Sequence, residues 1–172
     1  MSLLTEFKVL AIPDYRLVEI RDSDASLSDA KMVETAKVRV VASGGSQICI
    51  HSLQRDIDVQ VTIRIWDSPQ EPPHGVEGYT QVALESPTGV IGVDALITGD
   101  ACMSLPFPGS YEGHAAWINR QATADYVDEC IARAAEEEWT AVRIGQAHKE
   151  CPVLEQYCLD LWHTREPDAK TA

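Results

Sequence analysis

The sequence predicts a mainly β protein: an antiparallel β-sandwich of about eight strands with one C-terminal helix, formed as a single domain over residues 1–172. Three observations support this fold class. The valines and isoleucines of 59–65 fall on one side of an extended chain, because side chains of a strand alternate between its faces. Turn residues recur about every 8–12 positions, a spacing typical of antiparallel sandwiches. Helical spacing of apolar residues is confined to about 124–143.

Extended segments are predicted through most of the chain, each bounded by turn residues. In order they are 6–12, 15–21, 37–42, 47–51, 59–66, 79–85, 90–96, 102–105, 110–118 and 154–162. The Gly44-Gly45 pair between two apolar runs indicates a β-hairpin. The Asp- and Ser-rich segment 22–29 is predicted as a loop. A short helix over 28–36 is the open alternative, because Ser28 is a suitable N-cap.

The single helix is predicted at about 124–143, where the pattern changes from alternating to helical. Thr123 is a suitable N-cap, and acidic residues lie near the start, where the helix dipole favours them. Gly145 is a suitable stop. The segment 154–162 is then predicted as the closing strand, and 164–172 as a frayed polar tail.

Composition limits the functions that are open to this chain. Its 27 Asp and Glu outnumber its 14 Lys and Arg, which gives a formal net charge of −13. Nucleic acids and anionic membranes bind proteins through Lys and Arg, so neither is an expected partner. No apolar run is long enough for a membrane helix and no signal peptide is recognisable, so we expect a cytoplasmic protein. The five cysteines form no CxxC pair, which favours reduced thiols over disulfides.

Charge is distributed unevenly along the chain. Between residues 67 and 119 there are acidic residues but no Lys or Arg, which produces a field of one sign. Trp66 precedes this block and points away from the apolar face of its strand, so a helix, a second layer or a partner must cover it. The predicted partner-binding surface consists of Trp66, Asp67, Glu71, Glu77, Glu85, Asp94, Asp100 and Glu112. A solvated acidic face without a partner is the alternative.

Groups that could carry chemistry match no specific motif. Zinc takes tetrahedral sets of Cys and His. The set most similar to a zinc site is His148, Cys151, Cys158 and His163, but its spacing fits no standard zinc finger. Cys49 and His51 share one strand face, without the loop or helix N-terminus that would activate a thiol. No metal, cofactor or catalytic residue is predicted, and the sequence leaves open whether the protein is an enzyme.

The order of several short motifs resembles a known group of proteins. After a Gly-rich hairpin come Trp66-Asp67, Ser86-Pro87-Thr88-Gly89, Leu105-Pro106-Phe107-Pro108-Gly109-Ser110-Tyr111 and Glu155-Gln156-Tyr157-Cys158-Leu159-Asp160-Leu161-Trp162. This order is similar to that of small, largely uncharacterised bacterial β-sandwich proteins. It is more distantly similar to the bacterial competence protein that inhibits the DNA-entry nuclease. The resemblance covers roughly residues 37–162 and carries over no catalytic residue.

The chain departs from this group in three places. The segment 105–111 has one extra residue, and the strand after it has Glu112 and His114 in place of the usual Arg-x-Arg pattern. The predicted helix at 124–138 is an insertion. The resemblance therefore implies the architecture but does not identify the partner.

These observations favour a non-enzymatic, acidic protein-binding module, and specifically an inhibitor or immunity-type protein that docks a basic partner such as a nuclease. A second hypothesis is a small-ligand-binding protein or hydrolase, which requires a Cys–His–acid group at a pocket in or beside the sandwich. A third is a structural homo-oligomer paired through sheet edges. The oligomeric state is left open by the sequence.

Overall fold

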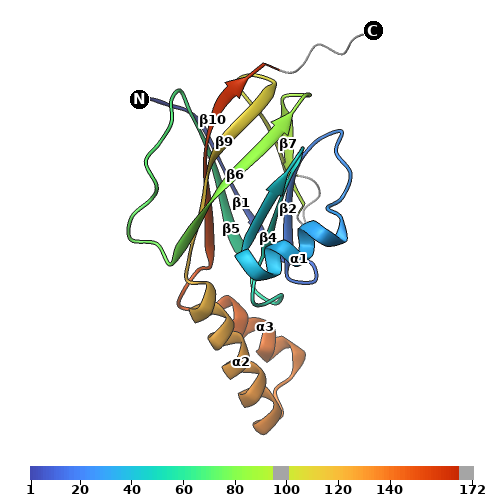
Figure 1. Ribbon diagram of the computed structural model, residues 1–172. Helices are drawn as coiled ribbons and strands as arrows, with labels where there is room; N and C mark the ends of the chain where they lie inside the picture. The colour runs from blue at the N-terminus through green and yellow to red at the C-terminus, as the bar shows by residue number, and fades with distance from the viewer. Residues whose placement is uncertain (95–100, 167–172) are drawn as a thin grey trace.

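The computed structural model describes residues 1–94 and 101–166. Within these ranges the chain forms two sheets and three helices (Figure 1). The strands are β1 (Leu3–Ala11), β2 (Leu17–Asp22), β3 (Val41–Gly44), β4 (Gln47–His51), β5 (Val59–Trp66), β6 (Gly78–Ser86), β7 (Val90–Val93), β8 (Ala101–Ser104), β9 (Gly109–Ile118) and β10 (Gln156–Arg165). The helices are α1 (Ala30–Arg39), α2 (Arg120–Glu136) and α3 (Ala141–Lys149). The mainly β prediction is confirmed, although the described residues contain ten strands and three helices where about eight strands and one helix were predicted.

Each of the two sheets has five strands. Sheet A has the order β1-β5-β10-β9-β6, and sheet B has the order β3-β4-β2-β7-β8. The prediction of a wholly antiparallel arrangement is wrong for β5 and β10, which run parallel with Leu159 opposite Ile63. Parallel neighbours need a long crossover between them, and here most of the chain separates the two strands. The closing strand therefore lies at the centre of sheet A, between β5 and β9.

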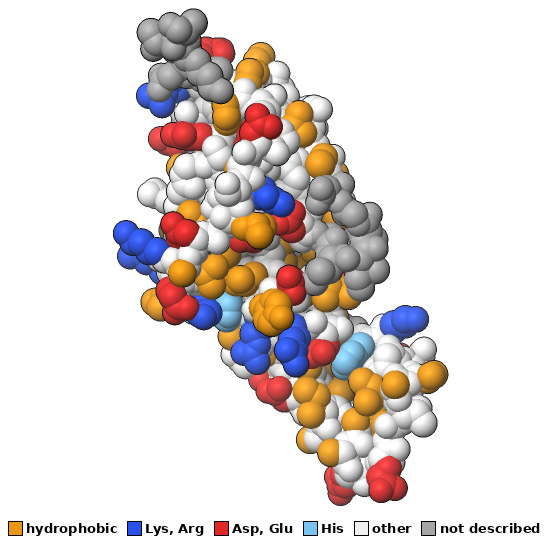
Figure 2. Space-filling model, turned by 90° about the vertical axis from the view of Figure 1, so that its right-hand side faces the viewer, with side chains coloured by type: hydrophobic (Ala, Val, Ile, Leu, Met, Phe, Trp, Pro, Cys, Tyr) orange, Lys and Arg blue, Asp and Glu red, His pale blue; other side chains and the backbone are white. Residues whose placement is uncertain are grey.

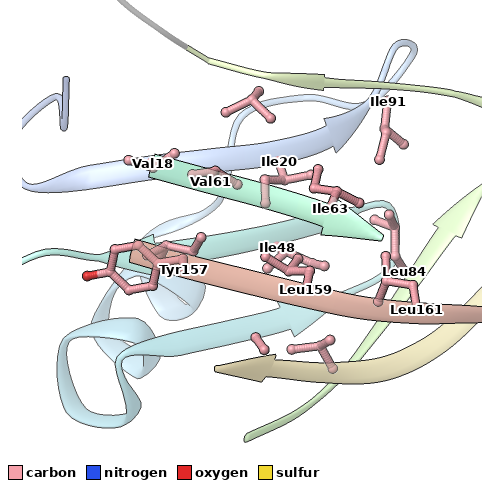
Figure 3. Close-up of a cluster of buried hydrophobic side chains, with 14 of the residues drawn as sticks. Val18, Ile20, Ile48, Val61, Ile63, Leu84, Ile91, Tyr157, Leu159 and Leu161 are labelled. Carbon is pink, nitrogen blue, oxygen red and sulfur yellow. The ribbon is translucent and has the colours of Figure 1, made fainter. Parts of the chain in front are cut away.

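The hydrophobic core lies between the two sheets. All four apolar residues of 59–65 are at most 1% exposed, as their alternation predicts. They pack with side chains from sheet B that include Val18, Ile20 and Ile48 (Figure 3). Burial of each side chain of this size contributes roughly 1.5–3 kcal/mol, so β5 is a principal element of the core.

Hydrogen bonds join the two sheets along the β6 edge. The Ala83 backbone N–H donates to Ser43 Oγ at 3.0 Å, and the Glu85 N–H donates to the Gly45 carbonyl at 2.8 Å. The β3–β4 hairpin, predicted from its Gly-Gly pair, is confirmed. Gly45 adopts a φ of +55°, which glycine accepts without steric cost.

A buried carboxylate holds the turn 86–89. Asp22 Oδ2 accepts hydrogen bonds from Ser86 Oγ at 2.6 Å and Thr88 Oγ1 at 2.7 Å, and Oδ1 accepts one from the Asp24 N–H at 3.0 Å. Burial raises the pKa of Asp22, but these hydrogen bonds outweigh burial and lower the pKa overall. Asp22 thereby ties the end of β2 to the end of β6.

The first helix corresponds to the alternative left open by the sequence. α1 begins after Asp29, whose side chain accepts a hydrogen bond from the Met32 N–H at 2.8 Å, so Asp29 rather than Ser28 is the N-cap. The segment 37–42, predicted as a strand, is divided between the end of α1 and the start of β3. α1 buries Ala36 and lies against β3 and β4 of sheet B (Figure 1).

The single helix predicted at about 124–143 is instead two helices, α2 and α3. Glu138 has a φ of +52° between them, and Thr140 restarts the helical backbone by accepting a hydrogen bond from the Arg143 N–H at 3.2 Å. The pair projects from one end of the sheets (Figure 1), so neither α2 nor α3 lies over a sheet face. Within the described ranges, no helix has the length and apolar character needed to cross a membrane.

Candidate functional site

The outer face of sheet A is the side that points away from sheet B. Because Ile63 and Ile65 point into the core, alternation places Arg64 and Trp66 on this outer face. Strand register then defines the other outward residues, which are Glu6, Lys8, Tyr79, Gln81, Ala83, Glu85, Glu112, His114, Cys158, Asp160 and Trp162. In Figure 1 the 67–77 connection runs on this side, and none of the described helices lies over it. The side chain of Trp66 is therefore not covered by a helix.

Three residues at the centre of this face hold one another in place. The Arg64 guanidinium donates from Nε and Nη2 to the two oxygens of Asp160, both at 2.7 Å. Trp66 Nε1 donates to Asp160 Oδ1 at 2.6 Å, and the Arg64 guanidinium carbon lies 5.7 Å from the Trp66 ring centroid. Paired, planar donors of this kind stabilise the ion pair and also fix the relative orientation of the two side chains. The indole is therefore held rigidly, and the charge of Arg64 is neutralised internally.

His114 lies between two aromatic side chains on the same face. Its ring centroid is 5.9 Å from that of Tyr79, in an edge-on arrangement, and 5.5 Å from that of Trp162. The residue is only 6% exposed, yet Nδ1 has no hydrogen-bond partner among the described residues. Buried polar atoms are normally paired, so this nitrogen is an unsatisfied polar atom enclosed beneath the outer face.

A hollow opens beside His114, and we refer to it as the Ala83 hollow. It is lined by residues of β3, β6, β9 and β10, among them Ser43, Gln81, Ala83, Glu112 and Trp162. Ala83 contributes only a methyl group where its neighbours have long side chains. Gly113, beneath the hollow, is a glycine because a Cβ there would lie 1.9 Å from the Asp160 carbonyl oxygen.

The structure brings together some of the predicted partner-binding residues. Trp66, Glu85 and Glu112 all lie on the outer face of sheet A. Asp67 follows Trp66 at the end of β5, where hydrogen bonds from the Ser2 N–H and the neighbouring serine hydroxyl lower its pKa and favour its charged form. Glu71 is exposed on the 67–77 connection.

Other members of the predicted set lie elsewhere. Asp94 follows β7 of sheet B, where it forms an ion pair with Arg21 at 3.2 Å. Glu77 accepts a hydrogen bond from the Arg120 N–H at the start of α2, at 3.2 Å. Asp100 lies outside the described residues. The acidic block of the sequence is therefore distributed over both sheets instead of forming one surface.

Cationic side chains gather on the side of sheet B. Figure 2 looks onto this side and shows Lys and Arg side chains close to the level at which the helix pair leaves the sheets. A hollow at this level is lined by Arg16 and Arg55 together with Tyr15 and Ile131. On the outer face of sheet A, Arg64 is bound by Asp160 and Lys8 by Glu6, while the exposed Glu85 and Glu112 line a hollow that also includes Arg165.

The cysteines and histidines do not assemble a catalytic or metal centre in the part of the chain described. Cys158, His114 and Asp160 share the outer face of sheet A, but burial raises the pKa of the Cys158 thiol to about 11, and the charge of Asp160 adds to this effect. A thiol with such a pKa is a poor nucleophile at neutral pH. Among the described residues no three Cys, His, Asp or Glu side chains are placed to hold a metal ion. His148 and Cys151 lie at the end of α3, far along the chain from His163 near the other end of β10.

One buried polar network was missed by the sequence analysis. Glu155 is fully buried, and its Oε2 accepts hydrogen bonds from Ser52 Oγ and Gln54 Nε2, each at 3.0 Å. Tyr157 donates its hydroxyl to the other oxygen. Burial raises the pKa of Glu155 despite these hydrogen bonds. Because Gln54 also binds the Ile57 backbone, this network anchors the loop before β5. In the sequence, Glu155 and Tyr157 indicated only a strand, because the residues that bind Glu155 come from the distant segment 52–54.

Comparisons with known proteins identify solved structures with the same fold but no family. No family model matches the chain, and no curated protein matches it. The crystal structure of ComJ from Bacillus subtilis, described as the inhibitor of the DNA-degrading activity of NucA, matches with a TM-score of 0.58 and 14% identity over 95% of this chain and 98% of ComJ. A structure described as crocagin biosynthetic gene J matches with a TM-score of 0.53 and 15% identity over 96% of this chain and 100% of that one. The chain thus shares its fold with the nuclease-inhibiting competence protein that its sequence distantly resembles.

Proposed function

We propose that this protein is an inhibitor that binds a basic protein partner through the outer face of sheet A, and that the partner is a nuclease. The observation that carries this proposal is that none of the described helices covers this face (Figure 1). It presents two half-buried tryptophans, Trp66 and Trp162, next to the exposed carboxylates Glu85 and Glu112. Interface centres are enriched in tryptophan, and charged groups at the rim steer the partner.

The partner class is supported by the shared fold. ComJ inhibits the DNA-degrading activity of NucA, so this fold supports inhibition of a nuclease in at least one protein. A nuclease that binds DNA phosphates presents Lys and Arg around its active site. An inhibitor with exposed carboxylates competes for the same cations, and a net charge of −13 attracts a basic partner.

Rigidity of the face favours this kind of binding. The Asp160 carboxylate fixes both Arg64 and Trp66, so little side-chain entropy remains to be lost when a partner docks. The central part of the surface is preorganised, and its exposed acids lie around it. Rigid aromatic groups surrounded by charge are well suited to a partner with a basic cleft.

The test measures inhibition of DNA degradation. NucA and the basic protein fraction of a lysate of the source organism would be incubated with fluorescent DNA, with and without the purified chain. Two variants alter the proposed surface, Trp162→Ala and Glu112→Lys. Glu129→Lys, on an exposed position of α2, is the matched control for Glu112→Lys because both variants make the same change in net charge.

We expect the chain to inhibit one of these activities in a complex that weakens as ionic strength rises. The two surface variants should lose inhibition while Glu129→Lys retains it. The proposal is wrong if inhibition is insensitive to both surface variants, or if no nuclease activity is reduced at low salt.

A further inference from the structure

We infer that the Ala83 hollow receives an arginine side chain of the partner. This inference rests on the proposed function, because it assumes that a basic protein docks on the outer face of sheet A. It adds the chemistry of one specific contact. The relevant residues are Ala83, Glu112, Trp162, His114 and Gln81, all of which line the hollow.

The register of the strands explains why the hollow exists. Ala83 lies opposite Glu112, and Glu112 lies opposite Trp162 on the next strand. A methyl group is therefore followed across the sheet by a carboxylate and then by an indole. The gap over Ala83 is open to solvent, since Ala83 is itself exposed, and the longer side chains around it form its walls.

The lining of the hollow includes hydrogen-bond acceptors beside the Trp162 indole. Glu112 supplies an exposed carboxylate, and the exposed Gln81 supplies a side-chain amide oxygen. Ala83 and Glu85 direct their N–H groups toward sheet B. Alternate residues of an antiparallel strand direct backbone groups the same way, so the backbone N–H and carbonyl of Gln81 both point toward sheet B and its side chain is left for the hollow. A guanidinium, with five donors in a planar fork, matches such a lining better than an ammonium does.

The indole of Trp162 offers the second component of an arginine site. Two other tryptophans of this chain already have a guanidinium over the ring. Arg64 lies 5.7 Å from the Trp66 centroid, and Arg143 lies 4.7 Å from the Trp139 centroid. No such contact with Trp162 is found among the described residues. An arginine placed between Trp162 and Glu112 would gain both a cation–π contact and a charged hydrogen bond.

The experiment uses the isotope-labelled full chain and three peptide probes: triarginine, trilysine and triglutamate. The readout is the indole N–H resonance of Trp162 in a two-dimensional NMR spectrum, with Trp139 as an internal control on the distant helix pair. Ala83→Leu fills the hollow without changing charge, and Glu112→Gln removes the charge without changing shape. Glu129→Gln, exposed on α2, is the control for loss of one carboxylate.

We expect triarginine to shift the Trp162 resonance in a saturable way, trilysine to shift it less, and triglutamate to leave it in place. Glu112→Gln should weaken triarginine binding by about five- to tenfold, Ala83→Leu should abolish the shift, and Glu129→Gln should change neither. The inference is overturned if the Trp162 resonance does not respond to triarginine. It is also overturned if triarginine shifts this resonance in Ala83→Leu and Glu112→Gln as strongly as in the wild type.

The two proposals fail separately. If triarginine binds as expected but no nuclease is inhibited, the arginine site stands and the nuclease-inhibitor function is wrong. If a nuclease is inhibited equally well by wild type and by Ala83→Leu, the inhibitor function stands and the arginine site is wrong.

Discussion

Replacement of Asp160 by asparagine tests whether the centre of the outer face is as rigid as its hydrogen bonds indicate. Asp160 is 8% exposed, and its carboxylate accepts three hydrogen bonds, two from Arg64 and one from Trp66. Asp160→Asn keeps an acceptor for the indole but places an amide N–H₂ against the guanidinium. Removal of one partner from a fully buried ion pair costs about 3–5 kcal/mol. The Arg64 side chain is 34% exposed, so water can solvate it in the variant and the cost is reduced. We expect a loss of about 2 kcal/mol.

Urea unfolding followed by tryptophan fluorescence measures this loss. With a denaturant slope of roughly 2 kcal/mol per molar, a loss of about 2 kcal/mol lowers the midpoint by about 1 M without a change in slope. Glu6→Gln is the matched control, because Glu6 lies opposite Arg64 on β1 and forms an exposed ion pair with Lys8 at 3.1 Å. An exposed pair contributes roughly 0.2–1 kcal/mol.

The reasoning is refuted if Asp160→Asn destabilises no more than Glu6→Gln does. A double-mutant cycle with Arg64→Met separates the ion pair from the Trp66 hydrogen bond, because residues in direct contact show non-additive effects. If the two single losses simply add, Arg64 and Asp160 do not act as a unit. In that case the loss in Asp160→Asn comes from the Trp66 hydrogen bond and not from the ion pair.

Three further predictions use urea unfolding as the measurement. Asp22→Asn should cost about 1–3 kcal/mol at neutral pH. Its pKa is lowered in the fold, so this stabilisation should be lost as pH falls from 3.8 through the folded value, and a difference that grows in acid would contradict this. Glu155 has the opposite sign: with its pKa raised, the wild type should lose stability as pH rises from 4.5 through the folded value, and Glu155→Gln should remove that slope. Gly113→Ala should cost more than about 3 kcal/mol, because its Cβ would overlap a backbone oxygen. Gly145→Ala, with nothing within 4 Å of the added Cβ, should stabilise α3 by about 0.5–1 kcal/mol. Equal effects of the two variants would refute the steric argument.

Local patterns predicted the strands well, because strand alternation is a property of consecutive residues. The four buried residues of β5 are an example, as is the Gly-Gly hairpin between β3 and β4. The pairing of strands depends on distant segments. The parallel neighbour of β5 is β10, and the residues that meet there, such as Arg64 and Asp160, are 96 positions apart. No local pattern contains that information.

The helix boundaries failed for a similar reason. The apolar spacing of 124–143 continues through the break between α2 and α3, and only the positive φ of Glu138 and the new cap at Thr140 separate them. Propensity alone does not favour a left-handed conformation at a glutamate. The choice between a loop and α1 likewise depended on Asp29, which is one of several suitable caps in an Asp- and Ser-rich segment.

The candidate site shows why an acidic run in a sequence is a weak guide to an acidic surface. Adjacent strands of the chain need not belong to one sheet: β6 is part of sheet A, whereas β7, only a turn away, is part of sheet B. Asp94 is therefore removed from Glu85 by the topology and neutralised by Arg21. Glu112 lies on the same face as Glu85, because β9 pairs with β6.

Internal pairing decides which charges remain for a partner. Arg64, the large cation at the centre of the outer face, is bound by Asp160, and the two charges cancel. The exposed Glu85 and Glu112 lie at the β6–β9 side, where Arg165 lines a hollow with them. The indole of Trp162 lies directly beside one of these acids, Glu112. A face with this composition favours a cationic, planar side chain over either an apolar or an anionic one, which is why arginine is the sharpest probe of the site.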